Sequence, residues 1–280
     1  DNPFGGFLKG KYYFLVGDSA SGKTFLSMTC FAEACVNKRF KDYRLIYDNV
    51  EDGCLIDLEN LFNKTVAERV EPPVMTKEGP SYSFTIEEFY YNLDEAIKKG
   101  QPFIYILDSM DSLTSSPELE KFEEHKKAHT EGKKAPGSYG DGKAKKNSEG
   151  LRKVLNGLRQ TGSILIVLSQ TRANIGSAFG GKTRSGGHAL RFYATTEIWS
   201  SIQGKITKTV EGKKRDIGVN VALKVKKNRI TGKQHEVVID IYPSYGIDDV
   251  GSCVDYLLLE DWWDMKKQTI IATDLGLKGT

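Results

Sequence analysis

Short apolar runs that end in small, polar or acidic residues mark the first two thirds of the chain. Four of them predict buried strands, over residues 12–16, 44–48, 103–107 and 163–170. Helix-forming segments alternate with these runs, over residues 24–37, 57–70, 86–99 and 151–159. Because buried strands that alternate with helices are typical of parallel sheets, the pattern predicts an α/β fold with a doubly wound, mostly parallel sheet.

The rest of the chain is less regular. Residues 114–148 have little apolar periodicity and predict a long loop or insertion, and the glycine-rich residues 174–187 predict a second loop. Two β-prone segments, 218–227 and 234–242, flank a polar turn and predict a late β-hairpin. We expect one core domain over residues 1–245 and a short C-terminal segment over 246–280, in which no element stands out.

Composition is that of a soluble globular protein, with 39% hydrophobic and 28% charged residues among 280. No run approaches the 18 apolar residues of a membrane span, and no signal peptide is visible. The four cysteines form no C-x-x-C pair, so we expect reduced thiols and a cytoplasmic location. His125 and His129 have i, i+4 spacing but no third metal ligand, which favours a solvated helix face.

The most specific motif follows the first predicted strand and precedes the first predicted helix. It reads G-x-x-x-x-G-K-[ST], the P-loop pattern, whose small residues let backbone N–H groups surround a phosphate. Lys23 can reach the β- and γ-phosphates of a nucleotide, and the hydroxyl of Thr24 can ligate Mg²⁺. The predicted ATP-binding residues are Gly17, Asp18, Ser19, Ala20, Ser21, Gly22, Lys23 and Thr24.

A carboxylate ends the third predicted strand, at Asp108. Ligands of open α/β sheets bind beyond the carboxyl ends of the strands, so downstream of a P-loop this aspartate is the natural Walker B residue. We therefore predict that Asp108 and Thr24 hold Mg²⁺, and that the protein uses ATP and Mg²⁺.

Positive charge is concentrated in two segments, although the net charge is only +3. Residues 121–160 contain eleven Lys or Arg against five acids, and residues 171–196 contain four Lys or Arg and no acid. Such segments attract a phosphate backbone, although a solvated loop explains the charge alone equally well.

Several later motifs give the chain a family resemblance. Residues 168–176, then Phe179-Gly180, then the block Ser185–Ala194 resemble the bacterial and phage RecA recombinases. Residues 225–230 resemble that family's late basic segment, and residues 245–247 resemble its entry into the C-terminal part. With the P-loop and Asp108, the resemblance extends from about Gly5 to Val254 and implies a RecA-type P-loop NTPase fold.

The resemblance also implies roles for individual residues. Gln170 would detect the γ-phosphate and pass its presence to the segment that follows. That segment would be a second DNA-contacting loop, and a first would lie within residues 136–147. The DNA-binding residues implied for the two loops are Lys143, Lys145, Lys146, Arg172, Ile175, Phe179, Lys182, Arg184, Gly186 and Gly187.

The catalytic residues implied by the resemblance come from three places in the chain. Lys23 and Gln170 would act in the chain's own site, whereas Lys227 and Arg229 would reach a neighbour's ATP like arginine fingers. The water-activating carboxylate follows the second strand, where Glu51 is our first choice and Asp48 the alternative, because this region is one residue longer than the family pattern.

The function implied is that of a DNA-stimulated ATPase that binds single-stranded DNA and promotes homologous pairing and strand exchange with double-stranded DNA in recombination and repair. The working unit would be a homo-oligomeric filament or ring in a bacterial or phage-infected cell, with no membrane involved. The alternatives are a hexameric RecA-fold helicase or DNA motor, and a regulatory nucleotide-binding module.

This chain departs from the family pattern in three places. It begins with Asp1, almost at the core, so we expect either trimming or a different mode of assembly. Its C-terminal tail is short, which argues against a gateway role for duplex DNA, and residues 118–134 look like an insertion.

Overall fold

The computed structural model describes residues 6–51, 57–77, 79–132, 142–173, 182–184 and 187–279. Within these ranges one large sheet has the order β11-β10-β9-β8-β1-β6-β5-β2, with β7 on the end of β6. Its strands are β1 (Lys11–Gly17), β2 (Arg44–Asn49), β5 (Phe103–Asp108), β6 (Ile164–Ala173), β7 (Lys182–Arg184), β8 (Thr196–Val210), β9 (Lys213–Asn228), β10 (Glu236–Tyr242) and β11 (Gly246–Asp248).

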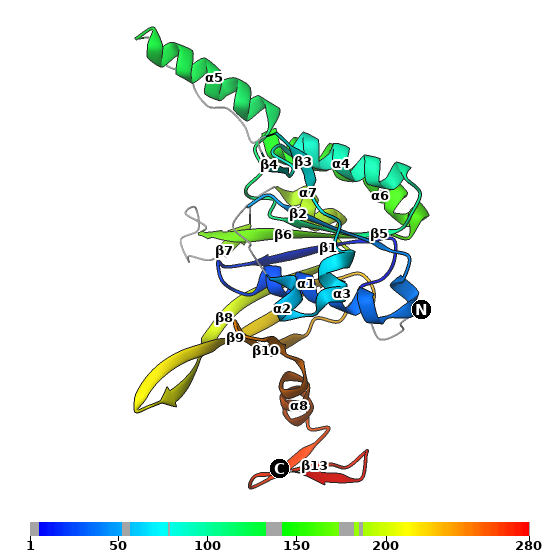
Figure 1. Cartoon of the computed structure of the whole chain (residues 1–280), viewed down its shortest axis with the longest axis vertical. Coiled ribbons are helices and arrows are strands. Elements are labelled where there is room, and N and C mark those ends of the chain that lie inside the picture. The colour runs from blue at the N-terminus through cyan, green and yellow to red at the C-terminus, as the bar shows by residue number, and fades with distance from the viewer. Residues whose placement is uncertain are drawn as a thin grey trace.

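The sheet changes character at β8. From β2 to β8 every pair of neighbours is parallel, whereas β8–β9, β9–β10 and β10–β11 are antiparallel. The prediction of a mostly parallel, doubly wound core is therefore confirmed, and so is the late hairpin, in which Glu236 pairs with Lys224. Figure 1 shows the far ends of β8 and β9 leaving the body as a two-stranded ribbon.

Helices cover both faces of the parallel strands. Figure 1 shows α4 (Ile86–Lys98), α6 (Gly142–Thr161) and α7 (His188–Tyr193) on one side of the sheet. On the other side lie α1 (Lys23–Val36), α2 (Leu58–Leu61) and α3 (Lys64–Arg69). The short elements η1 (Lys38–Phe40), β3 (Val74–Thr76) and β4 (Gly79–Ser81) connect the larger ones.

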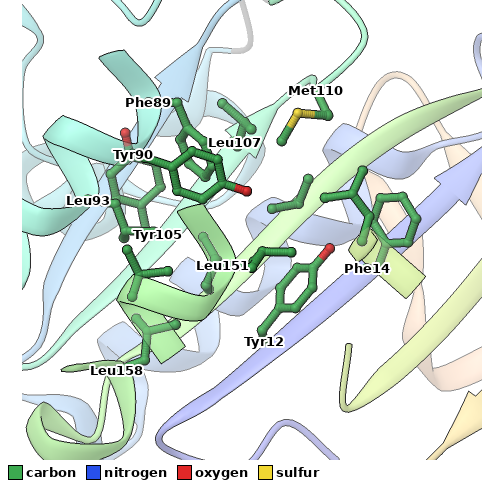
Figure 2. Packing of buried hydrophobic residues seen from close by; sticks show 14 of the residues in the cluster. Tyr12, Phe14, Phe89, Tyr90, Leu93, Tyr105, Leu107, Met110, Leu151 and Leu158 are labelled. Atoms are coloured by element: carbon green, nitrogen blue, oxygen red, sulfur yellow. The ribbon is translucent and has the colours of Figure 1, made fainter. Parts of the chain in front are cut away.

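Strand β1 joins the two cores because its side chains alternate between the faces of the sheet. Tyr12, Phe14 and Val16 enter the core beneath α4 and α6, where Figure 2 shows Tyr12 and Phe14 among the packed residues. Tyr13 and Leu15 enter the core beneath α1. A central strand that is buried on both faces reads as a continuous apolar run, which is why the sequence predicted it well.

Two expectations about the helices are wrong. Residues 114–148 are not a single loop, since α5 spans Ser116–Thr130 and α6 already begins at Gly142. Helix α5 has no buried residue and projects from the body in Figure 1, so its sequence carries no apolar stripe that would reveal it. Residues 57–70 form two helices, because the side chain of Asn63 caps a new helix by accepting a hydrogen bond from the N–H of Val66.

The C-terminal residues contain helix α8 (Asp249–Leu259) and a small sheet of β12 (Asp264–Lys266), β13 (Thr269–Ala272) and β14 (Leu277–Gly279). The boundary that we predicted at residue 245 stays a prediction, although β11 just beyond it still pairs with the large sheet. Cys30, Cys35 and Cys253 are free thiols, and Cys54 lies outside the described residues. None of the helices in the described ranges is both long and apolar enough to cross a membrane.

Candidate functional site

The residues predicted to bind the nucleotide meet where the parallel strands end. Strands β1, β5 and β6 lie side by side and run in one direction, so Gly17, Asp108 and Gln170 reach the same edge of the sheet. A cavity of about 840 Å³ opens there. Its lining includes Ser19–Phe25, Glu51, Asp57, Asp108, Gln170, Lys205, Asp216 and Ile241.

The P-loop has no room for larger residues at its two glycines. A Cβ on Gly17 would lie 2.0 Å from Ser200 Oγ, and Gly22 has a φ of 75°, which side chains rarely adopt. Strand β8 supports the loop from the side, because Ser200 Oγ lies 2.7 Å from Ser21 Oγ. No side chain caps the first turn of α1, so its N–H groups and its dipole suit a phosphate.

The lysine of the P-loop, Lys23, is bonded to the backbone of the loop itself. Lys23 is only 8% exposed, and its Nζ donates a hydrogen bond to the carbonyl oxygen of Asp18 at 2.7 Å. Burial lowers the pKa of Lys23, while the nearby carboxylates of Asp108 and Glu51 oppose this shift. A buried ammonium that is bonded to a backbone oxygen can turn to phosphate oxygens instead, as the predicted role of Lys23 requires.

Oxygen atoms of the kind that Mg²⁺ prefers lie next to the loop. Thr24 Oγ1 donates to Asp108 Oδ2 at 2.6 Å, and Tyr47 OH donates to the same oxygen at 3.0 Å. Burial raises the pKa of Asp108, although both hydrogen bonds oppose the rise. A carboxylate and a hydroxyl at one edge of a phosphate cradle fit Mg²⁺, and Thr24 and Asp108 would hold it.

The two candidate carboxylates after β2 have different surroundings. Glu51 Oε1 accepts hydrogen bonds from Ser109 Oγ at 2.6 Å and from Gln170 Nε2 at 2.9 Å, and Glu51 lines the cavity. Asp48 is 4% exposed and accepts bonds from both the N–H and the hydroxyl of Ser83 and from Tyr105 OH. The geometry therefore favours Glu51 as the carboxylate that faces a ligand.

The late basic residues lie in a second hollow. Lys227 Nζ donates to the carbonyl oxygens of Arg191 and Phe192, and the guanidinium carbon of Arg229 lies 5.5 Å from the centre of the Phe192 ring. Both residues line this hollow and are absent from the described lining of the nucleotide cavity. Their predicted action on a neighbouring subunit stays a prediction.

The lysines of the first predicted DNA loop lie on a helix. Lys143 and Lys146 are in the first turns of α6, where Lys143 Nζ donates to the carbonyl oxygen of Leu113 at 2.7 Å and Lys146 pairs with Glu87 at 3.2 Å. Lys145, on the same helix, is exposed. The expected loop is thus corrected for residues 142–147, while the DNA-binding role of these lysines stays a prediction.

The second predicted DNA loop is described only at its ends. Arg172 at the end of β6 has a side chain that is 60% exposed, and Lys182 and Arg184 lie on β7, which pairs with that end. A Cβ on Gly187 would lie 2.6 Å from that of Ala144, so this end of the loop touches α6. Outside the described residues lie Ile175, Phe179 and Gly186, and the side chains of Lys182 and Arg184.

Sequence reasoning missed several residues of the site. Ser109 and Asp111 directly follow the predicted strand end at Asp108, and this position was a usable signal. Thr171, whose hydroxyl donates to the carboxylate of Asp18, gave the same signal, because it directly follows the predicted strand end at Gln170. Ser200 contacts the P-loop across 179 residues of sequence, so no local pattern points to it.

A strand, a phosphate loop and a helix, with a second strand's aspartate beside the loop threonine, define a P-loop nucleotide-binding protein. The sequence model of the family described as "RecA N-terminal domain" matches residues 92–248. The chain belongs to this family. The matched residues begin after the P-loop and include Asp108, Gln170 and Lys227.

Individual relatives extend the similarity over most of the chain. The protein named Protein RecA of Cytophaga hutchinsonii is 28% identical over 258 residues, which are 90% of this chain. Proteins of the same name from Caulobacter vibrioides and Brucella canis are 28% and 29% identical, again over 90% of this chain. The chain spans 62–63% of the length of these curated relatives.

Proposed function

We propose that this protein is a RecA-type recombinase that hydrolyses ATP with Mg²⁺ and binds single-stranded DNA. One observation carries the proposal: Gln170 bonds Glu51 in the nucleotide cavity and stands at the start of the basic segment. A side chain in this position can contact a bound nucleotide, and it is adjacent in sequence to the basic segment that follows. The relatives named Protein RecA support the proposal.

Chemistry would rest on the cavity residues. Lys23 binds the β- and γ-phosphates, and bound Mg²⁺, held by Thr24 and Asp108, would supply charge compensation on the phosphate oxygens. Glu51 orients the attacking water and accepts its proton. Glu51 Oε1 accepts hydrogen bonds from Ser109 and Gln170, and these two donors would hold the carboxylate in position beside the cavity while it acts on water.

DNA binding would rest on the surface beyond β6. Arg172, Lys182 and Arg184 contact phosphates, Ile175 and Phe179 contact bases, and the glycines add backbone N–H groups. Gly187 touches α6, so Lys145 on that helix extends the same surface. Lys227 and Arg229 complete a neighbour's site, which makes hydrolysis depend on a filament or ring of identical subunits.

The proposal is tested by measuring ATP hydrolysis while single-stranded DNA is titrated at several protein concentrations. We expect DNA to stimulate turnover, and we expect turnover per subunit to rise with protein concentration because cations from a neighbour are required. A rate that DNA leaves unchanged at every protein concentration would contradict the proposal. A closed hexamer that unwinds duplex DNA in one direction would favour the motor alternative instead.

The DNA surface is tested separately by the salt dependence of binding. Replacing Lys182 and Arg184 with Gln should lower the slope of log K against log salt by roughly one unit for each phosphate that the variant no longer binds. Lys64→Gln is the matched control, because Lys64 lies on α3 with a side chain that is 72% exposed. An unchanged slope in the double variant would remove this segment from the DNA site.

A further inference from the structure

A second large cavity opens at the edge of the sheet opposite the nucleotide cavity. It has a volume of about 650 Å³, and residues 6–9, α1, β5 and β6 all contribute to its lining. Strands β1 and β6 begin at this edge, with Lys11 beside Ile164, and end at the nucleotide edge. Figure 1 shows this edge at the end of β6 that lies away from β7. This rear cavity shares no described lining residue with the nucleotide cavity, so it is a separate site.

The inner wall of the rear cavity is apolar. Ile104, Ile164 and Ile166 line it from the sheet, belong to the core beneath α1 and are at most 3% exposed. Ala34 and Cys30 line it from α1, where Ala34 is buried and Cys30 packs against the same core. These five side chains offer a ligand apolar contacts and no charge.

The outer lining of the rear cavity is basic. Lys9, Lys11 and Arg39, which we term the rim cations, line it together with one carboxylate, that of Glu33. Lys9 and Arg39 are exposed, whereas Lys11 is half-buried at the start of β1. Because side chains alternate along a strand, Lys11 lies on the face of β1 that also carries Tyr13 and packs beneath α1. The three cations therefore surround an apolar interior.

The rim cations are available to an anionic ligand. Among the described residues none of them forms an ion pair. Lys9 Nζ lies 5.2 Å from the ring centres of both Phe40 and Tyr43, which keeps this ammonium beside the cavity. Glu33 Oε1 accepts a hydrogen bond from Asn37 Nδ2 at 2.9 Å, so this carboxylate is bonded within the end of α1.

An apolar interior with a basic rim is complementary to an amphipathic anion. Cavities of roughly 300–1,000 Å³ are typical of small-molecule sites, in which apolar walls bury the ligand and a few polar groups orient it. A polyanion such as a nucleotide does not suit the inner wall, because its phosphates would lose water there without gaining donors. A single acidic group can remain at the rim, where charged donors bind it.

We propose that the rear cavity binds an aliphatic carboxylic acid of the fatty-acid type. Its chain packs against the isoleucines of β5 and β6, and its carboxylate lies among the rim cations. The site is independent of ATP and DNA, since it lies at the other edge of the sheet from the nucleotide cavity.

The ligand class is tested by calorimetric titration with decanoate and with decanol, its uncharged counterpart of equal chain length. We expect decanoate to bind with one site per chain and decanol to bind about 10-fold more weakly, because the charge-assisted hydrogen bonds are missing. Equal affinities for the two compounds would overturn the role of the cations. An absence of decanoate binding would overturn the proposal.

The cations are tested with the double variant Lys11→Gln/Arg39→Gln. Its affinity for decanoate should fall by about 10-fold, while its affinity for decanol should stay within about 2-fold, a difference that mere damage to the cavity would not produce. Lys64→Gln is the matched control, because Lys64 lies on α3 outside the described lining of the cavity. An equal loss of decanoate affinity in the control would show non-specific attraction and contradict the proposal.

The place of binding is tested at Cys30, whose modification by methyl methanethiosulfonate is followed by mass spectrometry. Burial raises the pKa of the Cys30 thiol to about 12, so the reaction is slow enough to follow over time. At a decanoate concentration of about ten times Kd, the rate at Cys30 should fall by about 10-fold, because only the unliganded protein reacts. Cys253, exposed on α8, should react at an unchanged rate. Binding of decanoate without protection of Cys30 would place the ligand elsewhere and overturn the proposal.

Discussion

At the scale of residues, burial separates two carboxylates that lie three positions apart. Asp48 is surrounded by donors from Ser83 and Tyr105 and is absent from the described lining of the cavity. Glu51 is exposed and accepts bonds from side chains that can turn away. Asp48 should therefore contribute to the stability of the fold, and Glu51 to the turnover of ATP.

Paired variants test this division. Glu51→Gln should lower kcat by about 10²–10⁴-fold because a positioned base is removed, with the free energy of unfolding changed by less than about 0.5 kcal/mol. Asp48→Asn should cost about 1–3 kcal/mol of stability, because one buried donor is left without its acceptor, while turnover by the folded protein persists. Urea unfolding and steady-state ATP hydrolysis measure the two effects. If Asp48 were the catalytic carboxylate, Asp48→Asn would lower kcat and Glu51→Gln would leave kcat unchanged.

Tyr13 links the first described residues to the sheet. Its hydroxyl donates to the carbonyl oxygen of Leu8 and accepts from the N–H of the same residue. Tyr13 is 1% exposed, and burial raises the pKa of its hydroxyl from 10.0 to about 12. Ionisation is therefore easier in the unfolded chain than in the folded protein.

This shift predicts a pH dependence. The folded-state pKa lies above the unfolded one, so the stabilising contribution of Tyr13 is complete below pH 10 and is lost as pH rises through about 12. Tyr13→Phe removes that contribution, and its unfolding free energy should fall less steeply between these values than that of the wild type. Urea titrations at several alkaline pH values measure the two slopes. Parallel slopes would contradict the role of Tyr13.

At the scale of elements, α6 approaches α4 closely through glycines. A Cβ on Gly150 would lie 2.3 Å from the ring of Tyr90, and a Cβ on Gly157 would lie 2.6 Å from Ile97 Cγ2. The Tyr90 ring is fixed, because it is 8% exposed and its hydroxyl donates to Asn147 Oδ1 at 3.1 Å. The two helices therefore depend on the absence of a side chain at these positions.

Gly150→Ala should lower the free energy of unfolding by about 1–3 kcal/mol through overpacking, despite the better helix propensity of Ala. Gly142→Ala on the same helix is the matched control, because its Cβ would meet no atom of the described residues closer than 3.7 Å. Thermal and urea unfolding of both variants measure the difference. Equal stabilities would show that Tyr90 moves aside without cost.

The elements differ in how far their sequences predict them. Strands β1, β5 and β6 were found because burial on both faces produces continuous apolar runs. Helix α5 was missed because it buries nothing, and its start depends on a capping box in which Glu118 accepts from the N–H of Ser115. The break between α2 and α3 was missed because it depends on one side-chain cap.

The candidate site was predictable only where its residues follow a local motif. The P-loop and Asp108 follow from strand–loop–helix patterns, and the family resemblance supplied Gln170. The contact between Gln170 and Glu51 depends on β6 and β2, the strand before Glu51, both lying next to β5. The support of the P-loop by Ser200 depends on β8 as the other neighbour of β1. Strand order is a property of the whole sheet and has no short-range signal.

At the scale of the whole molecule, strands β12–β14 form a sheet of their own after α8. Their residues are mostly exposed, including Met265 of β12, and so is Trp262 just before them. Helix α8, by contrast, is tied to the large sheet, because Ser252 Oγ accepts a hydrogen bond from the N–H of Asp240 in β10. We therefore expect the large sheet to fold without the residues beyond α8.

Deleting residues 261–280 should leave nucleotide affinity within about 2-fold and the melting temperature of the remaining chain within a few degrees, since little buried structure is removed. Trp199 on β8 then becomes the only tryptophan, and its fluorescence reports unfolding of the sheet directly. Calorimetry and nucleotide titration measure both quantities. A large fall in the melting temperature of the truncated chain would show that the small sheet is part of the core.

The placement of β1 has a consequence for synthesis on the ribosome. This strand leaves the exit tunnel before both of its neighbours in the sheet, because β6 and β8 begin only at Ile164 and Thr196. At ribosomal elongation rates, roughly 8–30 s pass between the emergence of Gly17 and that of Gln170, its partner in the ladder. During this interval the nascent chain exposes the apolar segment Tyr12–Val16. We therefore expect a chaperone at the ribosomal tunnel exit to bind the nascent chain.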